Sequence, residues 1–253
     1  MARTVLISGA NRGLGFATAR LLGRQGLRVW LGSRSMNAGN AAAETLRAEG
    51  ADVSAIQLDI CDESSVAAAA ARIEAETGLD ILINNAAIMD EGGEPGGAAP
   101  PPSRVPLDAI ARTYSTNVLG TLRLTQQLLP VLLRSDAPRI VNVSSRLGSF
   151  GHQSDPQWPG RAVNKLGYSS SKAALNMATL MLAYELRDTS VKVNAVSPGI
   201  IATDLNGEGA EALRGRPGFG PPEDGADLVA RCALLPHDGP SGRFFGPGGE
   251  LAW

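Results

Sequence analysis

Short apolar runs alternate with longer helical patterns along most of the chain. The runs lack a strict apolar–polar alternation, which is typical of strands that are covered on both faces of a parallel sheet. Repeated strand–helix units with short links favour right-handed crossovers. We therefore predict an α/β fold, a doubly wound parallel sheet with helices on both faces. The predicted strands are Thr4–Ser8, Arg28–Leu31, Val53–Leu58, Ile81–Asn84, Arg139–Val143 and Lys192–Val196, with Gly242–Gly246 as a further candidate. The predicted helices are Gly15–Gln25, Ala38–Ala48, Glu63–Thr77, Leu107–Leu133 and Leu166–Arg187.

Composition narrows the classes of protein to which the chain can belong. At 253 residues it can bury a sizeable core, and no composition shift divides it, so we expect residues 1–253 to form a single domain. A net charge of −2 favours neither nucleic acid nor an anionic membrane as a partner. Cys61 and Cys232 lie far apart and only two His occur, so we expect neither a disulfide framework nor a metal site. No apolar run approaches the roughly 18 residues of a membrane span, and we expect a cytoplasmic protein.

Three segments are irregular in composition. Asp90–Pro106 is dense in Gly, Ala and Pro, Ser149–Lys165 contains two Pro, and Asn206–Glu223 contains five Gly and three Pro. In open α/β sheets, ligands bind outside the carboxyl ends of the strands, where these segments are expected to lie. They form either the walls and lid of a substrate pocket or surface insertions. For Asn206–Glu223 we favour a lid.

A glycine-rich turn follows the first predicted strand. Gly9, Gly13 and Gly15 form a Gly-x-x-x-Gly-x-Gly pattern that leads into a helix. Glycines permit a tight turn and a close backbone approach to a pyrophosphate, and the helix N-terminus supplies N–H donors and a positive dipole. The spacing alone is weak in a chain with 30 Gly. Its place between a strand and a helix makes it a predicted dinucleotide site.

The end of the second strand predicts which dinucleotide is bound. An acidic residue there would bond the ribose 2′-hydroxyl of NAD, whereas cationic residues accommodate the 2′-phosphate of NADP. Here the strand ends in Ser33-Arg34 with no acid, and Arg12 in the glycine turn can reach the same place. These residues predict NADPH, with NAD less favoured. The alternative is that Arg34 is a solvated surface residue.

Tyr168 and Lys172 lie four residues apart on a predicted helix, so they project from the same face. The lysine charge favours the phenolate, and we expect it to lower the pKa of Tyr168 from about 10 towards neutrality. Such a pair is a proton donor and acceptor for carbonyl and alcohol chemistry. Two unrelated helix-surface residues are the alternative interpretation.

Taken with their order along the chain, these motifs resemble the classical short-chain dehydrogenase/reductase family over essentially the whole length. The pattern is most similar to its NADPH-dependent carbonyl reductase branch, and the resemblance implies a Rossmann fold. The matching landmarks are Gly9/Gly13/Gly15, Asp59, Asn84-Asn85-Ala86, Asn117, Ser144-Ser145, Tyr168/Lys172 and Ser197-Pro198-Gly199 with Thr203. The cofactor-binding set thereby predicted is Gly9, Asn11, Arg12, Gly13, Leu14, Gly15, Ser33, Arg34, Asp59, Ile60, Asn85, Ala86, Tyr168, Lys172, Pro198, Gly199, Ile201 and Thr203.

The resemblance also implies catalytic roles. Tyr168 would protonate the carbonyl oxygen, and Lys172 would lower its pKa and bond the nicotinamide ribose. Ser145 would donate to the substrate oxygen, and Asn117 would hold a water that links Lys172 to solvent.

Several of these assignments have structural alternatives. The choice of Ser145 over Ser144 rests on the family alone. Asn117 could instead bond a nearby backbone group. Asp59, which the resemblance places at the adenine, could instead cap a helix.

The resemblance implies further roles around the cofactor. Ile201 (through its backbone) and Thr203 would hold the carboxamide, and Asn85 would line the cleft.

The chain departs from the family pattern in three places. Ala87 replaces a Gly, which would strain the backbone if φ were positive and otherwise narrows the cleft. Ser8 replaces a Thr but keeps the hydroxyl. Ser145 and Tyr168 are 23 residues apart, longer than usual, which puts the family's common tetramer in doubt and leaves monomer or homo-oligomer open. In the extra segment, His152 and Trp158 are expected to pack within the loop rather than act as ligands.

The predicted function is NADPH-dependent reduction of a ketone or aldehyde, reversible to alcohol oxidation. The alternatives are a non-catalytic NADPH-binding sensor or scaffold, an NAD-linked alcohol dehydrogenase, and an epimerase or dehydratase that uses the same Tyr/Lys pair. The complete catalytic set argues against a sensor. The substrate is expected to be a small-molecule carbonyl compound that is apolar and moderately bulky. Its expected pocket residues are Met89, Leu147, Phe150, Trp158, Ile200, Leu205 and Phe219.

Overall fold

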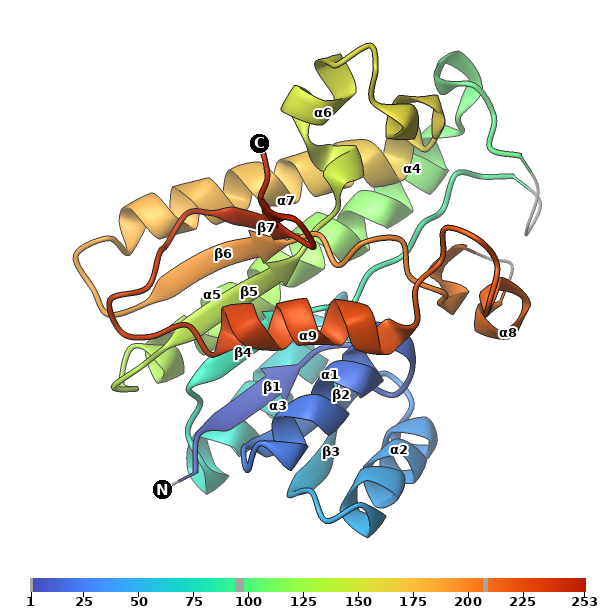
Figure 1. Ribbon diagram of the computed structural model, residues 1–253. Coiled ribbons are helices and arrows are strands. Elements are labelled where there is room, and N and C mark those ends of the chain that lie inside the picture. The colour runs from blue at the N-terminus through green and yellow to red at the C-terminus, as the bar shows by residue number, and fades with distance from the viewer. Residues whose placement is uncertain (1, 94–97, 207–208) are drawn as a thin grey trace.

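The strands of the protein form one twisted sheet, seen in the computed structural model of Figure 1, which describes residues 2–93, 98–206 and 209–253. The strand order is β3-β2-β1-β4-β5-β6-β7-β8, parallel throughout except for the antiparallel β7–β8 pair at one edge. The predicted doubly wound sheet is therefore confirmed, with one short antiparallel strand added. The strands are β1 (Thr4–Ile7), β2 (Arg28–Ser33), β3 (Val53–Gln57), β4 (Ile81–Asn84), β5 (Arg139–Val143), β6 (Lys192–Val196), β7 (Phe244–Gly246) and β8 (Gly249–Glu250).

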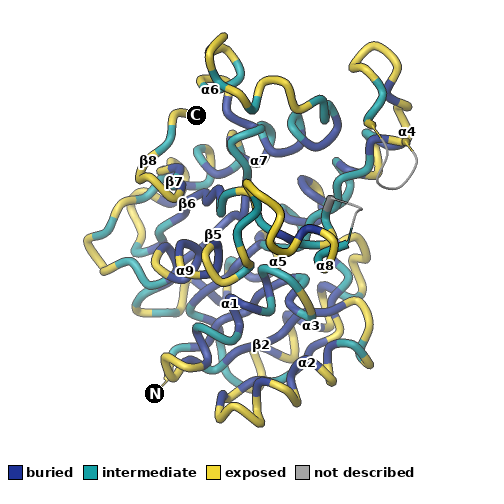
Figure 2. Tube along the Cα trace, turned by 45° about the vertical axis from the view of Figure 1, so that its right-hand side comes forward, coloured by how far each residue is buried: buried dark blue, intermediate teal, exposed yellow. Residues whose placement is uncertain are grey.

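Helices cover both faces of the sheet, and each face has its own apolar core (Figure 1). On one face lie α1 (Gly13–Arg24), α2 (Met36–Ala48) and α9 (Pro222–Ala233). On the other lie α3 (Glu63–Glu76), α5 (Thr121–Leu132) and α7 (Leu166–Glu185). Most residues of β1 to β7 are buried, as Figure 2 shows, which explains why these strands are largely apolar, whereas β8 is exposed. The shorter helices are α4 (Leu107–Tyr114), α6 (Phe150–Ser154) and α8 (Ala210–Leu213).

The order of the strands reverses next to β1. From β1 the chain moves outward through β2 and β3, then returns so that β4 pairs with the opposite edge of β1. The crossovers on the two sides therefore diverge above the carboxyl ends of β1 and β4. In doubly wound sheets this divergence leaves a crevice, which is the usual place of a ligand.

The structure corrects three of the predicted elements. The predicted helix Leu107–Leu133 is interrupted by a π-helical segment, Ser115–Gly120, between α4 and α5. The helix α9, which the sequence reading did not predict, begins at Pro222 within the segment interpreted as irregular. The segment Ser149–Lys165 contains α6 and a 3₁₀ turn, Pro159–Ala162. The apolar pattern runs through the π segment unbroken, so it gave no sign of the interruption.

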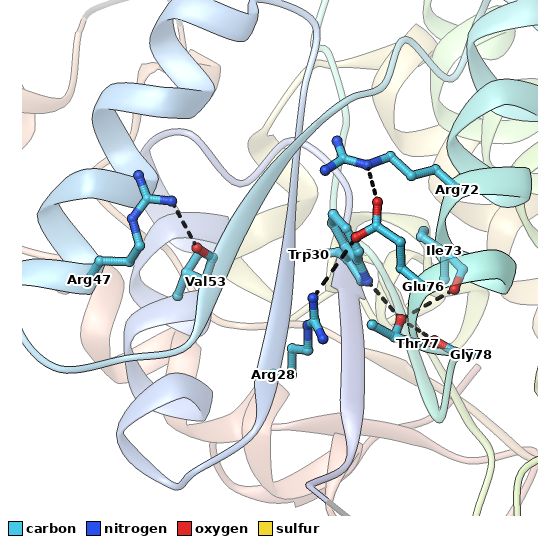
Figure 3. Close-up of polar contacts among 9 residues, drawn as sticks. All are labelled: Arg28, Trp30, Arg47, Val53, Arg72, Ile73, Glu76, Thr77 and Gly78. Atoms are coloured by element: carbon cyan, nitrogen blue, oxygen red, sulfur yellow. Dashed lines mark hydrogen bonds and ion pairs between the residues drawn. The ribbon is translucent and has the colours of Figure 1, made fainter.

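A polar and aromatic cluster ties α3 to β2 at the edge of the scaffold (Figure 3). Trp30 is fully buried, and its indole N–H donates to the Thr77 hydroxyl at 3.0 Å. The Arg72 guanidinium lies 4.9 Å from the Trp30 ring centre and also pairs with Glu76 at 2.8 Å. An aromatic ring with its polar end satisfied gives large apolar burial at low cost. This contact holds the C-terminal end of α3 against β2.

Candidate active site

A single cleft of about 1040 Å³ occupies the crevice at the carboxyl ends of the strands. Every residue of the predicted cofactor-binding set lines this cleft, and Ser145 lines it too. Asn117 does not, because its side chain is fully buried behind the cleft wall. The sequence-predicted groups therefore converge on one space, with Asn117 supporting it from behind.

The glycine turn has the backbone geometry that its pattern predicts. Gly9 and Gly13 have φ values of +63° and +57°, a region that favours glycine. A Cβ on Gly15 would lie 2.6 Å from both the Asn85 side-chain nitrogen and the Gly9 carbonyl oxygen. Helix α1 begins here with no side-chain cap and no acidic residue in its first turn. Its free N–H groups and positive dipole therefore fit an anionic ligand such as a pyrophosphate.

Ser8 fastens the ends of β1 and β4 together below the turn. Its hydroxyl oxygen accepts hydrogen bonds from the backbone N–H groups of Asn85 and Ala86, each at 3.0 Å. The Asn85 amide in turn donates to the carbonyl oxygens of Ser8 and Gly9. Serine thus supplies the hydroxyl that this position needs. No described non-glycine residue has a positive φ, so Ala87 carries no backbone strain.

The residues expected to bind a 2′-phosphate, Arg12, Ser33 and Arg34, all line the cleft. Arg34 and Arg12 are both exposed and line the cleft. Arg12 forms an ion pair with Asp204 at 2.8 Å in the absence of a ligand. Ser33, from which we expected a hydrogen bond to the same phosphate, is buried, and its hydroxyl donates to the Ser35 carbonyl at 2.8 Å.

Asp59 and Ile60, the residues expected to contact the adenine, line the cleft in the turn after β3. The Asp59 carboxylate accepts the Cys61 backbone N–H at 2.9 Å, which fixes the turn after β3. The alternative that Asp59 caps α3 is wrong, since Asp62 is the capping residue and accepts the Ser64 N–H. Asp59 therefore stays a candidate for adenine contact. Ile60 packs against Gly120, where a Cβ would come within 2.9 Å of its side chain.

Tyr168 and Lys172 lie together on α7 in the cleft wall. Both are almost fully buried, and the Lys172 ammonium lies 5.5 Å from the centre of the Tyr168 ring. It donates to the Val143 carbonyl at 2.8 Å. The pairing on one helix face is as predicted.

The predicted lowering of the tyrosine pKa is wrong for the ligand-free protein. Burial raises the pKa of Tyr168 to about 12, and a hydrogen bond with Ser145 offsets part of that rise. Burial also lowers the pKa of Lys172 to about 7. The sequence argument counted the attraction between the two charges and omitted the cost of removing each from water. At neutral pH the phenol is therefore protonated.

Ser145, rather than Ser144, presents its hydroxyl to Tyr168. Ser145 is half-buried, and its hydrogen bond with Tyr168 contributes to the pKa of the phenol. Ser144 is buried, and its hydroxyl donates to the Asn176 side-chain oxygen at 2.5 Å. The two neighbouring hydroxyls thus point to different places, because successive residues of an extended strand face opposite sides.

Asn117 lies in the π-helical segment and braces the cleft wall. Its side-chain oxygen accepts the Ile88 N–H, and its amide nitrogen donates to the Ile88 carbonyl, each at 2.9 Å. The same amide donates to the Ser171 hydroxyl at 3.0 Å. The alternative that Asn117 bonds nearby backbone is therefore confirmed for its side chain.

Apolar residues surround the remaining part of the cleft. Six of the seven expected pocket residues line it: Met89, Leu147, Trp158, Ile200, Leu205 and Phe219. Phe150 does not, because it is largely exposed on α6 and faces a second, shallower groove. His152 and Trp158 pack edge to face, with ring centres 5.3 Å apart, as expected for loop packing.

Sequence reasoning missed two carboxylates. Asp204 lines the cleft and pairs with Arg12, and Glu91 is buried against the start of α7. Nothing in the local sequence distinguishes either from a solvated acid, since each contact joins segments far apart in the chain.

The part of the chain that the structure describes has neither a metal-ligand cluster nor a membrane-spanning helix. It contains no group of three or more His, Cys, Asp or Glu side chains placed to hold a metal ion. Within the same residues, no helix combines the length and apolar character that crossing a membrane requires.

Comparison with known proteins extends these observations. Among curated relatives, (+)-neomenthol dehydrogenase from Arabidopsis thaliana is 33% identical over 293 residues, which cover 96% of this chain and 95% of that protein. Among solved structures, NADPH-bound carbonyl reductase from chicken fatty liver superposes with a TM-score of 0.81 at 25% identity, covering 100% of this chain and 99% of the other. Salutaridine reductase from Papaver somniferum gives a TM-score of 0.79 at 29% identity, covering 96% and 99%.

The family model for short chain dehydrogenases matches residues 3–213, which hold the glycine turn, the Ser145 strand end and the Tyr168 helix. These similar proteins are named for different activities, so carbonyl reductase is one branch among several. The family resemblance of the sequence motifs is confirmed, and the chain belongs to the short chain dehydrogenase family.

Proposed function

We propose that this protein reduces a ketone or aldehyde to an alcohol with NADPH, reversibly. The observation that carries the proposal is the state of Tyr168 in the cleft. Its phenol is buried, protonated at neutral pH and hydrogen-bonded with Ser145. It lines the same cleft as the glycine turn. Carbonyl reduction requires an acid in its protonated form beside the site of hydride delivery.

The residues that would hold the cofactor are those of the cleft wall. The glycine turn and the start of α1 would bind the pyrophosphate, and Asp59 and Ile60 would contact the adenine. Lys172 is assigned to the nicotinamide ribose, and Ile201 and Thr203 to the carboxamide. When bound, the cofactor supplies the hydride.

The chain's own residues handle the proton. Tyr168 gives its proton to the carbonyl oxygen, while the Ser145 hydroxyl donates a hydrogen bond to the same oxygen and stabilises its developing charge. Asn117 holds Ile88 and Ser171 in place. Its location in a π-helical segment, a form often found at functional sites, is compatible with a bound water that returns protons to Lys172.

The choice of NADPH over NAD rests on charge. The end of β2 carries Arg34 and no acid, and Arg12 lines the cleft nearby. A guanidinium makes strong charge-assisted hydrogen bonds with a phosphate. Solved structures of similar proteins with NADPH or NADP bound, such as the chicken carbonyl reductase, support the same choice. An NAD-linked alcohol dehydrogenase is the second candidate.

The substrate is proposed to be a small apolar carbonyl compound. Apolar side chains line the outer part of the cleft, among them Leu147, Trp158 and Phe219. The relative from Arabidopsis thaliana is named as a dehydrogenase of (+)-neomenthol, which supports a substrate of the alcohol and carbonyl class. A cytoplasmic location and a single domain spanning residues 1–253 complete the proposal.

The test is NADPH consumption by the purified protein with a panel of ketones, diketones and aldehydes, with Tyr168→Phe measured in parallel. Loss of a general acid lowers the rate by about 10² to 10⁴-fold. We expect turnover by the wild type, a loss of that size in the variant, and equal NADPH affinity in both. Tight NADPH binding without turnover of any carbonyl would instead favour a sensor or scaffold.

A further inference from the structure

Glu91 is a buried carboxylate that contacts the backbone of the proposed acid. It follows β4, in a segment interpreted from sequence as an irregular loop, and only 5% of it is exposed. One carboxylate oxygen accepts the Tyr168 backbone N–H at 2.9 Å, and the other accepts the Gly167 N–H at 3.1 Å. The two residues joined in the first contact are 77 positions apart in the chain.

This carboxylate caps helix α7 from outside the helix. The first N–H groups of a helix have no partner within it, and a side chain at the N-cap usually satisfies one of them. The N-cap residue here, Lys165, makes no such hydrogen bond. Glu91 satisfies two of these groups, and its negative charge lies at the positive end of the helix dipole. Among the described residues, no Lys or Arg pairs with it, so the helix start is its principal electrostatic partner.

Contacts with α4 hold the segment that carries Glu91. The Thr113 hydroxyl donates to the Asp90 carbonyl at 3.1 Å, and Arg112 pairs with the Asp90 carboxylate at 2.7 Å. A Cβ on Gly167 would lie 3.3 Å from the Asp90 carbonyl oxygen and 3.5 Å from a Glu91 oxygen. A glycine therefore allows this close approach. Contacts other than those with α7 therefore hold the segment that carries the carboxylate.

The backbone of Tyr168 is held from its other side as well. Its carbonyl oxygen accepts the Ser171 hydroxyl at 2.7 Å, and Ser171 accepts the Asn117 amide at 3.0 Å. Glu91 on the N–H and Ser171 on the carbonyl thus fix the peptide groups on both sides of one residue. The position of the phenol depends on this backbone.

We propose that Glu91 is a positioning residue for the reduction. It caps α7, fixes the backbone of Tyr168 and thereby sets where the phenol lies relative to Ser145 and the substrate carbonyl. This role rests on the proposed function of Tyr168 as the acid. A displacement of about 1 Å in a reacting group can lower a rate by roughly a hundredfold. Because Glu91 does not line the cleft, the loss should appear in kcat rather than in cofactor affinity.

The experiment compares Glu91→Ala and Glu91→Gln with the wild type, measuring kcat, KM and the dissociation constant for NADPH. We expect kcat to fall by about ten- to a hundredfold in Glu91→Ala. Glutamine keeps one acceptor oxygen but turns an NH₂ group toward the second N–H, so its kcat should be intermediate. NADPH affinity should change by less than about twofold in both. Glu185→Ala, an exposed carboxylate at the other end of α7, is the matched control and should leave kcat unchanged.

A second readout needs no substrate. The chain has three Tyr, so ¹³C labelling of the tyrosine ring gives few signals, and Tyr168→Phe assigns one of them. Removal of Glu91 should shift the Tyr168 signal and its titration while those of Tyr114 and Tyr184 stay in place. If the wild type reduces no carbonyl, the proposed function fails, and this shift still tests the contact.

Two results would overturn the positioning role. One is a kcat within about twofold of the wild type in Glu91→Ala. The other is a rise in KM alone. If Glu91→Ala does not fold, Glu91→Gln tests the positioning role instead. A kcat of Glu91→Gln equal to that of the wild type, or a failure of this variant to fold as well, would show that the carboxylate has only a structural role.

Discussion

The two ends of the cleft are built in different ways. At the cofactor end, backbone atoms approach one another closely around the glycine turn, and Ser8 and Asn85 join neighbouring strands. At the substrate end, short helices and turns are connected by side chains. Ser149, for example, donates to the Ala252 carbonyl, 103 residues away in the chain. Figure 2 shows exposed stretches gathered around α6 at that end.

This difference predicts which end of the cleft tolerates substitutions. A pyrophosphate is bound by backbone groups, so the cofactor end tolerates few changes in backbone or in glycine. A substrate pocket made of side chains on short segments can change shape without disturbing the sheet. We therefore expect substitutions at the cofactor end to alter binding or stability strongly, and those at the substrate end to alter KM.

The largest effect is expected from Gly15→Ala. The added Cβ would lie 2.6 Å from two atoms of the turn, and overpacking of this kind costs about 1–3 kcal/mol of stability. The same collision would open the pyrophosphate site, so NADPH affinity should fall by at least about a hundredfold, or about 2.7 kcal/mol. Thermal unfolding and NADPH fluorescence titration measure the two changes. Gly248→Ala is the control, since a Cβ there meets nothing within 4 Å; equal effects in both would contradict the comparison.

Arg34→Ala should weaken NADPH binding and spare NADH. A hydrogen bond to a charged group contributes about 1.5–3 kcal/mol, which corresponds to roughly ten- to a hundredfold in the dissociation constant. Isothermal titration with both cofactors gives the ratio. Arg187→Ala, an exposed arginine at the far end of α7, should leave that ratio unchanged. An equal loss of NADH affinity would show that Arg34 does not bind the 2′-phosphate of NADPH.

The buried lysine makes stability depend on pH. The pKa of Lys172 falls from 10.5 to about 7 on folding, so between these values the unfolded chain binds a proton that the folded protein does not. Stability should therefore rise with pH across this window, and the contribution of Lys172 should level off below pH 7, where both states are protonated.

Lys172→Met should remove this contribution. The difference between wild type and variant should change by at most about 1.4 kcal/mol per pH unit. Urea unfolding of the ligand-free proteins at pH 7, 8 and 9 measures it. Tyr168 and Cys232, whose pKa values burial raises to about 12, are present in both proteins and cancel in the comparison. A difference that is constant with pH would contradict the assignment.

The smallest effect is expected at the substrate end. Trp158→Ala removes an aromatic wall of the cleft and its packing with His152. We expect KM for an apolar carbonyl to rise several-fold, about 1 kcal/mol, with little change in NADPH affinity. Steady-state kinetics separate the two. A loss of NADPH affinity as large as that of Gly15→Ala would erase the distinction between the two ends.

The sequence predicted the strands and the backbone of the glycine turn well because their signals are local. Apolar runs marked the strands, and the turn from Gly9 to Gly15 carries its own conformational demand. Helix α9 was missed because the Gly- and Pro-rich stretch before it was read as continuing to Glu223. The start signal was present, since Pro222 is the first helical residue and two acids follow it in the first turn.

What the sequence could not predict depends on contacts between distant segments. The cap that Glu91 gives to α7 joins two segments that only the fold brings together. The pKa of Tyr168 depends on burial, which a spacing of four residues does not report. Both features depend on the surroundings of a residue in the fold, which the type and order of residues along the chain do not report.

The ion pair between Arg12 and Asp204 has a consequence for cofactor exchange. The chain places its own carboxylate 2.8 Å from an arginine that we assign to the cofactor phosphate. A phosphate that binds Arg12 would have to displace the Asp204 carboxylate. The free energy of breaking that ion pair reduces the net gain from binding the phosphate. Added salt weakens both the pair that is lost and the pair that is gained. The affinity for NADPH should therefore depend less steeply on ionic strength than it would if neither arginine had an acidic partner. When the oxidised cofactor dissociates, the Asp204 carboxylate can form its ion pair with Arg12 again.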